Sequence, residues 1–397
     1  MGPEHGADRL GPLPGYLTHR DGVAGDGTGG VVPITTPVGD KMWLVRDWAL
    51  GRRVLTDRRF SRAQAARPHA PRFNDAQPAP DAMMSMDGTE HARLRRIVSG
   101  AFTTGRAAAM KPAVERLTDE HLDRLAACGP PADLVAELAT PLPLAVLCSL
   151  LGIPPEDTAA FRDSVEVLFD ISASTPQEKS RRRLELVDYM GGLVERKRHG
   201  ARAGTGEEAD LLTGLIAAHD RGTLSMAELL TLLMAGYETT VGQIGLSVYT
   251  LLSDPGALAE LRARPALLEP VTEELLRLDP ATPLSFPRVA LEPVLLGGVT
   301  VQAGEAVVVS LLHGNRDAAV YDGPERLCPH GRDAAHLTFG HGVHRCLGAP
   351  LARLQLRVVL ERLLRRFPAL RLAAGPEPAV WKEGLSTRGL ARLSVEW

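Results

Sequence analysis

A cysteine flanked by glycines near the carboxyl end is the residue best suited to chemistry in this sequence. Residues 339–348 read FGHGVHRCLG, with two glycines before Cys346 and one after it, and a long helical pattern follows. Glycines let a backbone approach a flat ligand and adopt positive φ, and a helix dipole stabilises a thiolate at its N-terminus. Backbone N–H groups can then tune a metal bound to the sulfur. A buried, inert thiol is the alternative for a lone cysteine, but the spacing F-x-x-G-x-x-x-C-x-G favours a functional thiolate.

A second candidate is an acidic residue in an apolar helix. Residues 229–252 are apolar nearly all round, which predicts a buried helix, and residues 225–228 (SMAE) match a capping box at its start. Glu238 lies in the middle of this run, beside Thr239 and Thr240. A buried carboxylate is costly without partners, and buried ionisable groups are enriched at functional sites. From the helix alone, a salt-bridged structural glutamate is the favoured interpretation.

Two further helical pairs carry charge. Glu274 and Arg277 are three residues apart, which by itself predicts an ordinary surface pair. His91 and Arg95 are four residues apart, so one helix face presents two donors suited to a carboxylate.

Residues 339–348 resemble the haem-binding loop of the cytochrome P450 superfamily, and further segments from residue 87 onward match that family in the expected order. The resemblance covers nearly the whole chain. It implies a mainly α protein with a small β subdomain, the cytochrome P450 fold, formed by residues 1–397 as a single domain. It also implies haem b as the cofactor and Cys346 as the axial ligand of its iron.

The same resemblance assigns roles within residues 235–240 (AGYETT), which look like the family's oxygen-binding segment. Gly236 would leave room for dioxygen, and Glu238 and Thr239 would form the acid–alcohol pair that relays protons. Tyr237 stands where a histidine is common in related sequences, and it receives no catalytic role. The resemblance thus reverses the structural interpretation of Glu238.

Other residues match the family's haem contacts and its support behind the haem loop. The side chains expected to contact the haem propionates are His91, Arg95, Arg288 and His344, and the loop residues expected to hold the haem are Phe339, Gly340 and Gly348. In the family the E-x-x-R pair joins a later arginine in a buried structural network, and Arg326 is the candidate third member. Leu327 replaces the aromatic residue usual after that arginine.

The substrate pocket should come from segments that vary within the family, so the substrate remains open, with a bulky, mostly apolar secondary metabolite as the working expectation. The contributing segments are residues 65–86, residues 163–185, the oxygen helix and two later turns. The expected pocket residues are Met83, Met84, Ala235, Leu284, Ser285, Phe286 and Leu385.

The elements that position these residues follow from sequence periodicity. A β-hairpin is predicted over residues 31–36 and 41–45, helices predominate from residue 46 to 280, and short strands such as residues 307–312 follow. A last long helix begins after Pro350. Residues 1–30 are predicted to run as loop, and their glycine-rich stretch at 25–30 lacks the following helix that a phosphate-binding loop needs.

Composition excludes several classes. The 45 basic and 48 acidic residues leave a net charge of −3, and aromatics make up 4%, which argues against nucleic-acid binding. Cys128, Cys148, Cys328 and Cys346 form no metal-type pair and no disulfide scaffold. The N-terminus has no apolar signal segment, and the longest apolar run has a glutamate at its centre. We expect a cytoplasmic, monomeric protein without a membrane anchor.

The expected reaction is insertion of one atom of O2 into a small organic substrate, such as hydroxylation or epoxidation in secondary metabolism. The sequence has no flavin, dinucleotide or iron–sulfur fingerprint, so electrons should come from a ferredoxin and its reductase. Arg93, Arg345 and Arg353 could border the docking site of the donor. Oxidative coupling, ring formation and peroxide-driven oxidation stay open as alternatives, and a non-catalytic haem protein is disfavoured by the relay pair.

Overall fold

The computed structural model describes residues 30–397 apart from residues 74–79, 101, 154–156, 159–160, 162–175, 203–215, 217–234, 376–377 and 383–386. The chain divides into two compact units, each assembled from separated stretches. The first comprises residues 1–92, 246–346 and 386–389, and the second comprises residues 93–245, 347–385 and 390–397. Helices supply more residues than strands in the described parts, which confirms the expected mainly α architecture with a smaller β part. The predicted loop at residues 1–30 and the capping box at 225–228 lie outside the described residues.

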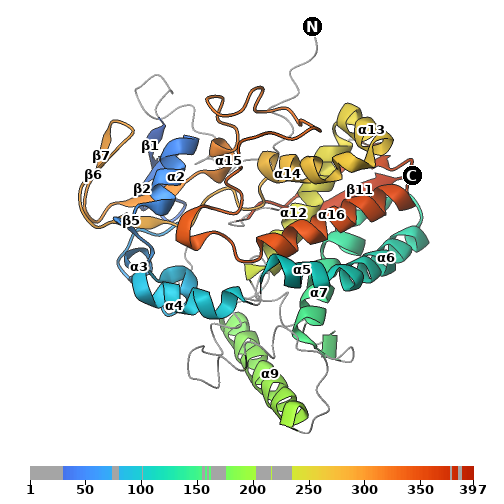
Figure 1. Ribbon diagram of the computed structural model, residues 1–397, viewed down its shortest axis with the longest axis horizontal. Helices are drawn as coiled ribbons and strands as arrows, with labels where there is room; N and C mark the ends of the chain where they lie inside the picture. The colour runs from blue at the N-terminus through green and yellow to red at the C-terminus, as the bar shows by residue number, and fades with distance from the viewer. Residues whose placement is uncertain are drawn as a thin grey trace. The chain divides into compact units, whose positions relative to one another are not determined.

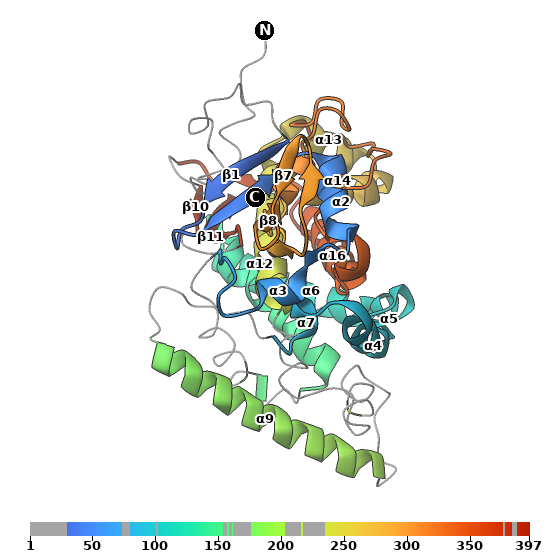
Figure 2. The same ribbon diagram turned by 90° about the vertical axis from the view of Figure 1, so that its left-hand side faces the viewer.

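The first unit contains a five-stranded sheet in the order β1-β2-β8-β5-β3. β1 and β2 form the predicted hairpin, with Val31 opposite Val45 and Thr35 opposite Lys41. β2 and β8 are parallel, whereas the other neighbours are antiparallel, and Figure 2 shows β1, β2 and β8 side by side. The strands are β1 (Val31–Thr35), β2 (Lys41–Val45), β3 (Phe60–Ser61), β5 (Arg288–Ala290) and β8 (Ala306–Val309).

This sheet is buried on both faces, because the side chains of β8 alternate between two apolar clusters. Val307 and Val309 pack in one cluster with Val54 and Leu55 of α2 (Trp48–Thr56). Ala306 and Val308 pack in the other. Burial on both faces explains why β8 reads as a continuous apolar run rather than an alternating one.

Shorter elements surround the sheet in the first unit. A separate hairpin pairs β6 with β7, and the helices after α12 are joined by short connections. These elements are α3 (Arg62–Ala65), η2 (Met83–Ser85), α13 (Pro255–Ala263), η5 (Pro265–Leu267), α14 (Leu268–Leu278), β6 (Val294–Leu296), β7 (Val299–Val301), α15 (Leu311–Gly314) and η6 (Gly342–His344).

The second unit is a set of helices with a small sheet in which β11 pairs with β10, β4 and β9. Its elements are α5 (Thr104–Ala109), α6 (Lys111–Cys128), β4 (Ala132–Asp133), the π-helix η3 (Val135–Ala139), α7 (Pro141–Leu151), α9 (Pro176–Arg202), α16 (Ala349–Arg366), β9 (Arg371–Leu372), β10 (Ala379–Trp381) and β11 (Leu390–Glu396).

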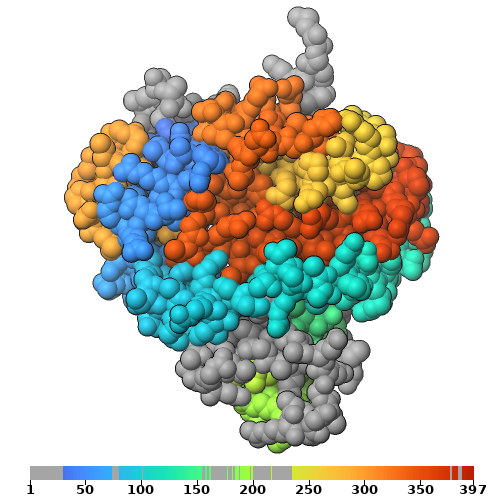
Figure 3. Space-filling view, viewed as in Figure 1, coloured from blue at the N-terminus to red at the C-terminus, as the bar shows by residue number. Residues whose placement is uncertain are grey.

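Helices α6 and α16 lie side by side in this unit (Figure 1). Arg362 of α16 reaches Glu115 and Asp119, one turn apart on α6, at 3.0 and 2.8 Å. The same pair of helices forms part of the surface in the space-filling view (Figure 3). The predicted last helix is therefore confirmed, and its buried residues include Leu354 and Val358.

Two helices belong partly to each unit. They are α4 (Gly88–Ser99), which carries His91 and Arg95, and α12 (Tyr237–Leu252), whose first turn contains Glu238 and Thr239. Among the described residues, no helix is long and apolar enough to cross a membrane.

Candidate active site

The loop before Cys346 is held by its own backbone. The amide of Cys346 donates to the carbonyl of Phe339 at 2.8 Å, and the amide of Gly340 donates to Leu337 at 2.7 Å. The Cys346 thiol is in no disulfide and belongs to an exposed residue. After two further residues the chain enters α16 at Ala349, with Gly348 as the N-cap. The fold therefore closes the loop on itself and keeps Cys346 exposed at its end.

Glycine is required at one position of this loop for two reasons. Gly342 has φ of +73°, and a Cβ on it would lie 2.7 Å from the carbonyl oxygen of Leu55. Any side chain would thus strain the backbone and collide with the end of α2. Gly340 also has positive φ, at +67°, with open space around it. The loop is seated on α2, where Arg52 donates to His341 at 3.3 Å.

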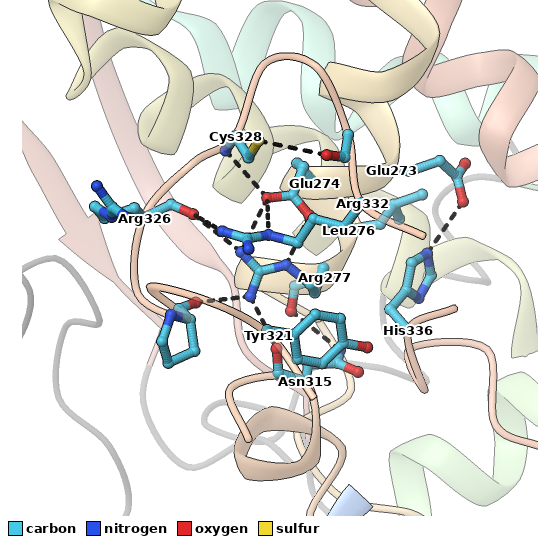
Figure 4. A network of polar contacts seen from close by, with 12 residues as sticks. Glu273, Glu274, Leu276, Arg277, Asn315, Tyr321, Arg326, Cys328, Arg332 and His336 are labelled. Atoms are coloured by element: carbon cyan, nitrogen blue, oxygen red, sulfur yellow. Dashed lines mark hydrogen bonds and ion pairs between the residues drawn. The ribbon is translucent and has the colours of Figure 1, made fainter. Parts of the chain in front are cut away.

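A buried polar network ties α14 to the chain that leads into the Cys346 loop (Figure 4). Arg277 is 1% exposed and donates to both carboxylate oxygens of Glu274, at 2.7 and 3.0 Å. It also donates to the carbonyls of Asn315 and Pro324. Asn315 in turn accepts from the amide of Leu337 at 2.6 Å, two residues before Phe339. The E-x-x-R pair is therefore a buried clamp and not the surface pair that its spacing alone suggests.

The third arginine of this network is Arg332, so the prediction of Arg326 was wrong. Arg332 donates from Nε to Glu274 at 3.1 Å, and its side chain is 14% exposed. Arg326 takes part only through its carbonyl oxygen, which accepts from Arg277 at 3.0 Å. Its guanidinium is 76% exposed and lies 4.0 Å from the exposed Asp322. The chain turns between the two arginines, with the amide of Gly331 donating to Cys328, and this turn brings the later arginine back to Glu274.

Buried cations gather in the first unit near the Cys346 loop. Arg62 and Arg288 are 4% and 5% exposed, and burial lowers the pKa of Arg288 to about 10 and that of Arg62 to about 9. Arg62 donates to the carbonyls of Met84 and Pro287. The Nε atom of Arg288 is buried and has no hydrogen-bond partner among the described residues.

One carboxylate faces this group. Burial raises the pKa of Asp87, but the nearby imidazole of His344 and hydrogen bonds from Ser61 and from nearby amides outweigh it, so that its pKa lies well below the ordinary value. His344 lies 3.8 Å from Asp87, and burial lowers the pKa of the imidazole. The ring of His344 stands 4.1 Å from the ring of His91, which is 3% exposed.

The residues present fit a haem. In the part of the chain that the structure describes, two buried guanidinium groups lie beside one carboxylate, that of Asp87, which leaves a positive excess that anionic propionates would balance. The Arg288 Nε atom offers a donor for one of them. Thiolate sulfur is a ligand of haem iron. The structure thus brings Arg288, His344 and His91 together, and their expected contact with the haem propionates remains a prediction. Arg95 lies one turn after His91 on α4, half-buried, and its expected haem contact remains a prediction.

The segment expected to relay protons forms the start of α12. The helical pattern is interrupted at Gly236, and the hydroxyls of Thr239 and Thr240 donate to the carbonyls of Ala235 and Gly236 at 3.1 and 2.6 Å. Threonine hydroxyls that bond four residues back compete with the helix ladder and favour a bend. Glu238 has a lysine partner, because Nζ of Lys382 donates to its Oε1 at 2.8 Å.

The expected pocket residues have different surroundings. Met83 is buried and Met84 is half-buried in η2, whereas Ala235 is exposed. Leu284 bridges to Ser310, and the Ser285 amide and hydroxyl bond to Val309, so both are fixed to the end of β8. Phe286 is 55% exposed, and its ring lies 4.9 Å from the guanidinium carbon of Arg62. Leu385, most of residues 163–185 and residues 74–79 lie outside the described residues. Substrate contact by these residues is a prediction.

Sequence reasoning missed four residues of these groups: Arg62, Asp87, Arg332 and Lys382. Arg62 follows Ser61, which caps α3, and this position gives no sign of burial. Asp87 lies directly before α4, and this position was the one available signal.

Comparison with known proteins gives the same family throughout. The cytochrome P450 family model matches residues 160–380. The chain is 42% identical to nocardicin C N-oxygenase of Nocardia uniformis over 92% of each chain. It is 40% identical to mycinamicin IV hydroxylase/epoxidase of Micromonospora griseorubida, over 92% of this chain and 91% of the relative.

Solved structures agree. The LnmA cytochrome P450 hydroxylase from the leinamycin biosynthetic pathway of Streptomyces atroolivaceus superposes with a TM-score of 0.86 at 39% identity. The alignment covers 99% of this chain and 98% of that one. Together with the buried Glu274–Arg277 clamp and the glycine-bounded Cys346 loop, these matches show that the chain belongs to the cytochrome P450 family, whose members bind haem b through a cysteine thiolate.

Proposed function

We propose that this chain is a haem-thiolate monooxygenase that inserts one oxygen atom into a small organic secondary metabolite, with Cys346 as the iron ligand. The observation that carries the proposal is the self-closed loop of residues 339–346, whose backbone hydrogen bonds hold the exposed Cys346 at its end. When bound, the haem supplies an iron centre made electron-rich by the thiolate and able to activate O2.

The protein's own residues would hold the haem, support the Cys346 loop and transfer protons. Arg288 and His344, with His91 and Arg95, would hold the propionates, and Phe339, Gly340 and Gly348 would line the loop side of the haem. The buried clamp of Glu274, Arg277 and Arg332 would keep that loop in place, because the Arg277 guanidinium donates to the carbonyl of Asn315 and the Asn315 side chain accepts from the amide of Leu337. Gly236 would leave room for O2, and Glu238 and Thr239 would move protons toward it.

The relatives support the substrate class. Nocardicin C N-oxygenase and mycinamicin IV hydroxylase/epoxidase are named for oxygen transfer to natural products. We infer that this chain also oxidises a bulky secondary metabolite, in contact with Met83, Met84, Ala235, Leu284, Ser285, Phe286 and Leu385. Among these, Phe286 offers an exposed aromatic surface two residues before β5.

Oxidative bond formation is the second candidate function. A solved relative at 38% identity and a TM-score of 0.85 is described as the putative thioether synthase SgvP of griseoviridin tailoring. Product analysis separates the two functions, since oxygen transfer adds the mass of one oxygen atom and leaves 18O2-derived label in the product.

A ferredoxin is the proposed electron donor, in a monomeric enzyme that works in the cytoplasm as one domain of 397 residues. Neither unit is a continuous stretch of chain, and α4 and α12 run from one to the other without a break, which supports a single domain. Arg93, Arg345 and Arg353 are proposed to attract the acidic donor. Arg93→Glu and Arg353→Glu should slow reduction by a ferredoxin and leave substrate affinity unchanged.

The direct test of the proposed function is a screen of natural products for the shift in haem absorption that follows displacement of water from the iron. A compound that gives the shift should be turned over with a surrogate ferredoxin and reductase, and the product should carry label from 18O2. Binding without labelled or coupled product would refute the monooxygenase proposal.

A further inference from the structure

The acidic member of the proposed relay does not stand alone. Glu238 lies in the first turn of α12, and Lys382 follows directly after β10. Their side chains are 13% and 24% exposed, and Nζ to Oε1 is 2.8 Å. The hydrogen bond is therefore charge-assisted and partly shielded from water, which makes it stronger than an exposed surface pair.

Packing explains why these residues meet although they are 144 positions apart. A Cβ placed on Gly245 of α12 would lie 3.9 Å from Leu390 of β11 and 3.8 Å from Val135 of η3, so this part of α12 packs against the small sheet. β10 is the antiparallel neighbour of β11, with a register shift between Val380 and Trp381. Lys382 thus leaves the sheet at the irregular end of β10.

The cation that contacts Glu238 is a lysine, which is rare in this arginine-rich chain. Only five of its 45 basic residues are lysines: Lys41, Lys111, Lys179, Lys197 and Lys382. Glu274, a carboxylate that is only 3% exposed, is bound at both oxygens by the guanidinium of Arg277. Guanidinium groups bind carboxylates in a rigid two-point fashion, whereas an ammonium is a single point charge on a flexible stem. Lys382, by contrast, donates from Nζ to one oxygen of Glu238, Oε1.

We propose that Lys382 is a positioning residue that restrains Glu238 with a releasable contact and thereby sets the rate of proton delivery. The proposal rests on the role proposed above for Glu238 and Thr239. In the restrained state the carboxylate faces Lys382. On release, the Glu238 carboxylate takes a proton from hydronium, leaving water, and gives it to the Thr239 hydroxyl oxygen, while the Thr239 hydroxyl passes its own proton to the reduced oxygen substrate. Glu238 is then a carboxylate again and Thr239 a neutral hydroxyl. Lys382 keeps its protons throughout, so it changes the rate and not the balance of the transfer.

This proposal predicts an order of rates that a merely structural salt bridge does not. With a surrogate ferredoxin and reductase and no substrate, O2 consumption by the haem-loaded protein should rise about threefold in Lys382→Met, since the restraint is lost. It should fall about threefold in Lys382→Arg, since a two-point contact is harder to release. Each factor corresponds to roughly 0.7 kcal/mol at RT of about 0.59 kcal/mol. Lys111→Met, which removes a surface lysine 3.9 Å from Glu115, should match the wild type.

A second measurement needs no turnover. Limited amine labelling, read by mass spectrometry for each lysine, should modify Lys382 roughly fivefold faster in Glu238→Gln than in the wild type. The labelling of Lys111 should be the same in both proteins. Equal labelling of Lys382 in the two proteins would show that the pair does not form and would overturn the proposal.

The variants also separate this proposal from the proposed relay. If Glu238→Gln leaves O2 consumption and its solvent isotope effect unchanged, the relay itself is refuted. If Glu238→Gln changes O2 consumption and its isotope effect, but Lys382→Met consumes O2 no faster than the wild type, the relay stands and the proposed restraint by Lys382 is refuted. The proposal also requires that Lys382→Met does not raise O2 consumption in a protein that already carries Glu238→Gln. An increase in this double variant would contradict it.

Discussion

Replacing Arg332 by alanine should destabilise this protein far more than replacing Arg326, although both lie in the chain that leads to the Cys346 loop. The Arg332 guanidinium is 14% exposed and donates to Glu274 Oε2 at 3.1 Å, and to the carbonyls of Gly323 and Arg326 at 3.2 and 3.3 Å. The Arg326 side chain is 76% exposed. The two substitutions therefore remove a buried network member and a surface side chain, respectively.

The magnitudes follow from what each change leaves behind. Without Arg332, Glu274 keeps both contacts to Arg277 and the amide of Cys328 at 3.1 Å, so the cost should be about 1.5–3 kcal/mol, that of a hydrogen bond to a charged group. Arg277→Met leaves the 3%-exposed carboxylate without its main partner and should cost about 3–5 kcal/mol. Arg326→Ala should stay within about 0.5 kcal/mol of the wild type.

The assay is urea-induced unfolding followed by circular dichroism, with haem content measured on the same samples. Arg277→Met should also lower haem retention, because it removes the bond from the Arg277 guanidinium to the carbonyl of Asn315, whose side chain holds the amide of Leu337. A free-energy loss for Arg326→Ala equal to that for Arg332→Ala would refute the assignment of the third arginine.

Three further predictions concern single residues. Thr239→Ala should still bind substrate but divert electrons to peroxide, measured as peroxide formed per NADPH consumed, and unchanged coupling would count against its proposed role. Burial, with Arg46 and Arg316 nearby, lowers the pKa of His313 from 6.5 to about 4. Because the unfolded chain binds this proton at a higher pH than the folded protein does, the stability of the fold is full above pH 6.5 and declines toward pH 4. The decline should reach about 3 kcal/mol and should be shallower in His313→Asn in urea titrations at each pH, whereas parallel curves would contradict it. Burial raises the pKa of the Cys148 thiol to about 12. Iodoacetamide at neutral pH should therefore modify the exposed Cys128 and spare Cys148. Equal labelling of the two cysteines would show that Cys148 is not buried.

Local patterns in the sequence predicted the local structure well. The hairpin at β1 and β2, the last helix and the glycine-bounded loop before Cys346 follow from alternation, helical periodicity and glycine placement. Each of these signals acts between residues close in sequence, so neighbours along the chain are enough to read it.

Contacts between distant segments could not be predicted in the same way. Helical spacing places Glu274 beside Arg277, but it does not say which loop arginine folds back onto them, and the wrong one was chosen. Lys382 reaches Glu238 because a small sheet packs against α12, and no sequence period records that packing. The burial of Arg62 depends likewise on carbonyl acceptors at Met84 and Pro287, which come from two different segments.

The central claim is that Cys346 supplies the axial thiolate of a haem. The most direct test is the absorption spectrum of the reduced, CO-bound protein, recorded for the wild type and for Cys346→Ala. The wild type should show the strongly red-shifted Soret band that thiolate coordination produces, and the variant should lack it while remaining folded by circular dichroism. A wild-type band like that of a histidine-ligated globin, or a red-shifted band that persists in Cys346→Ala, would contradict the assignment.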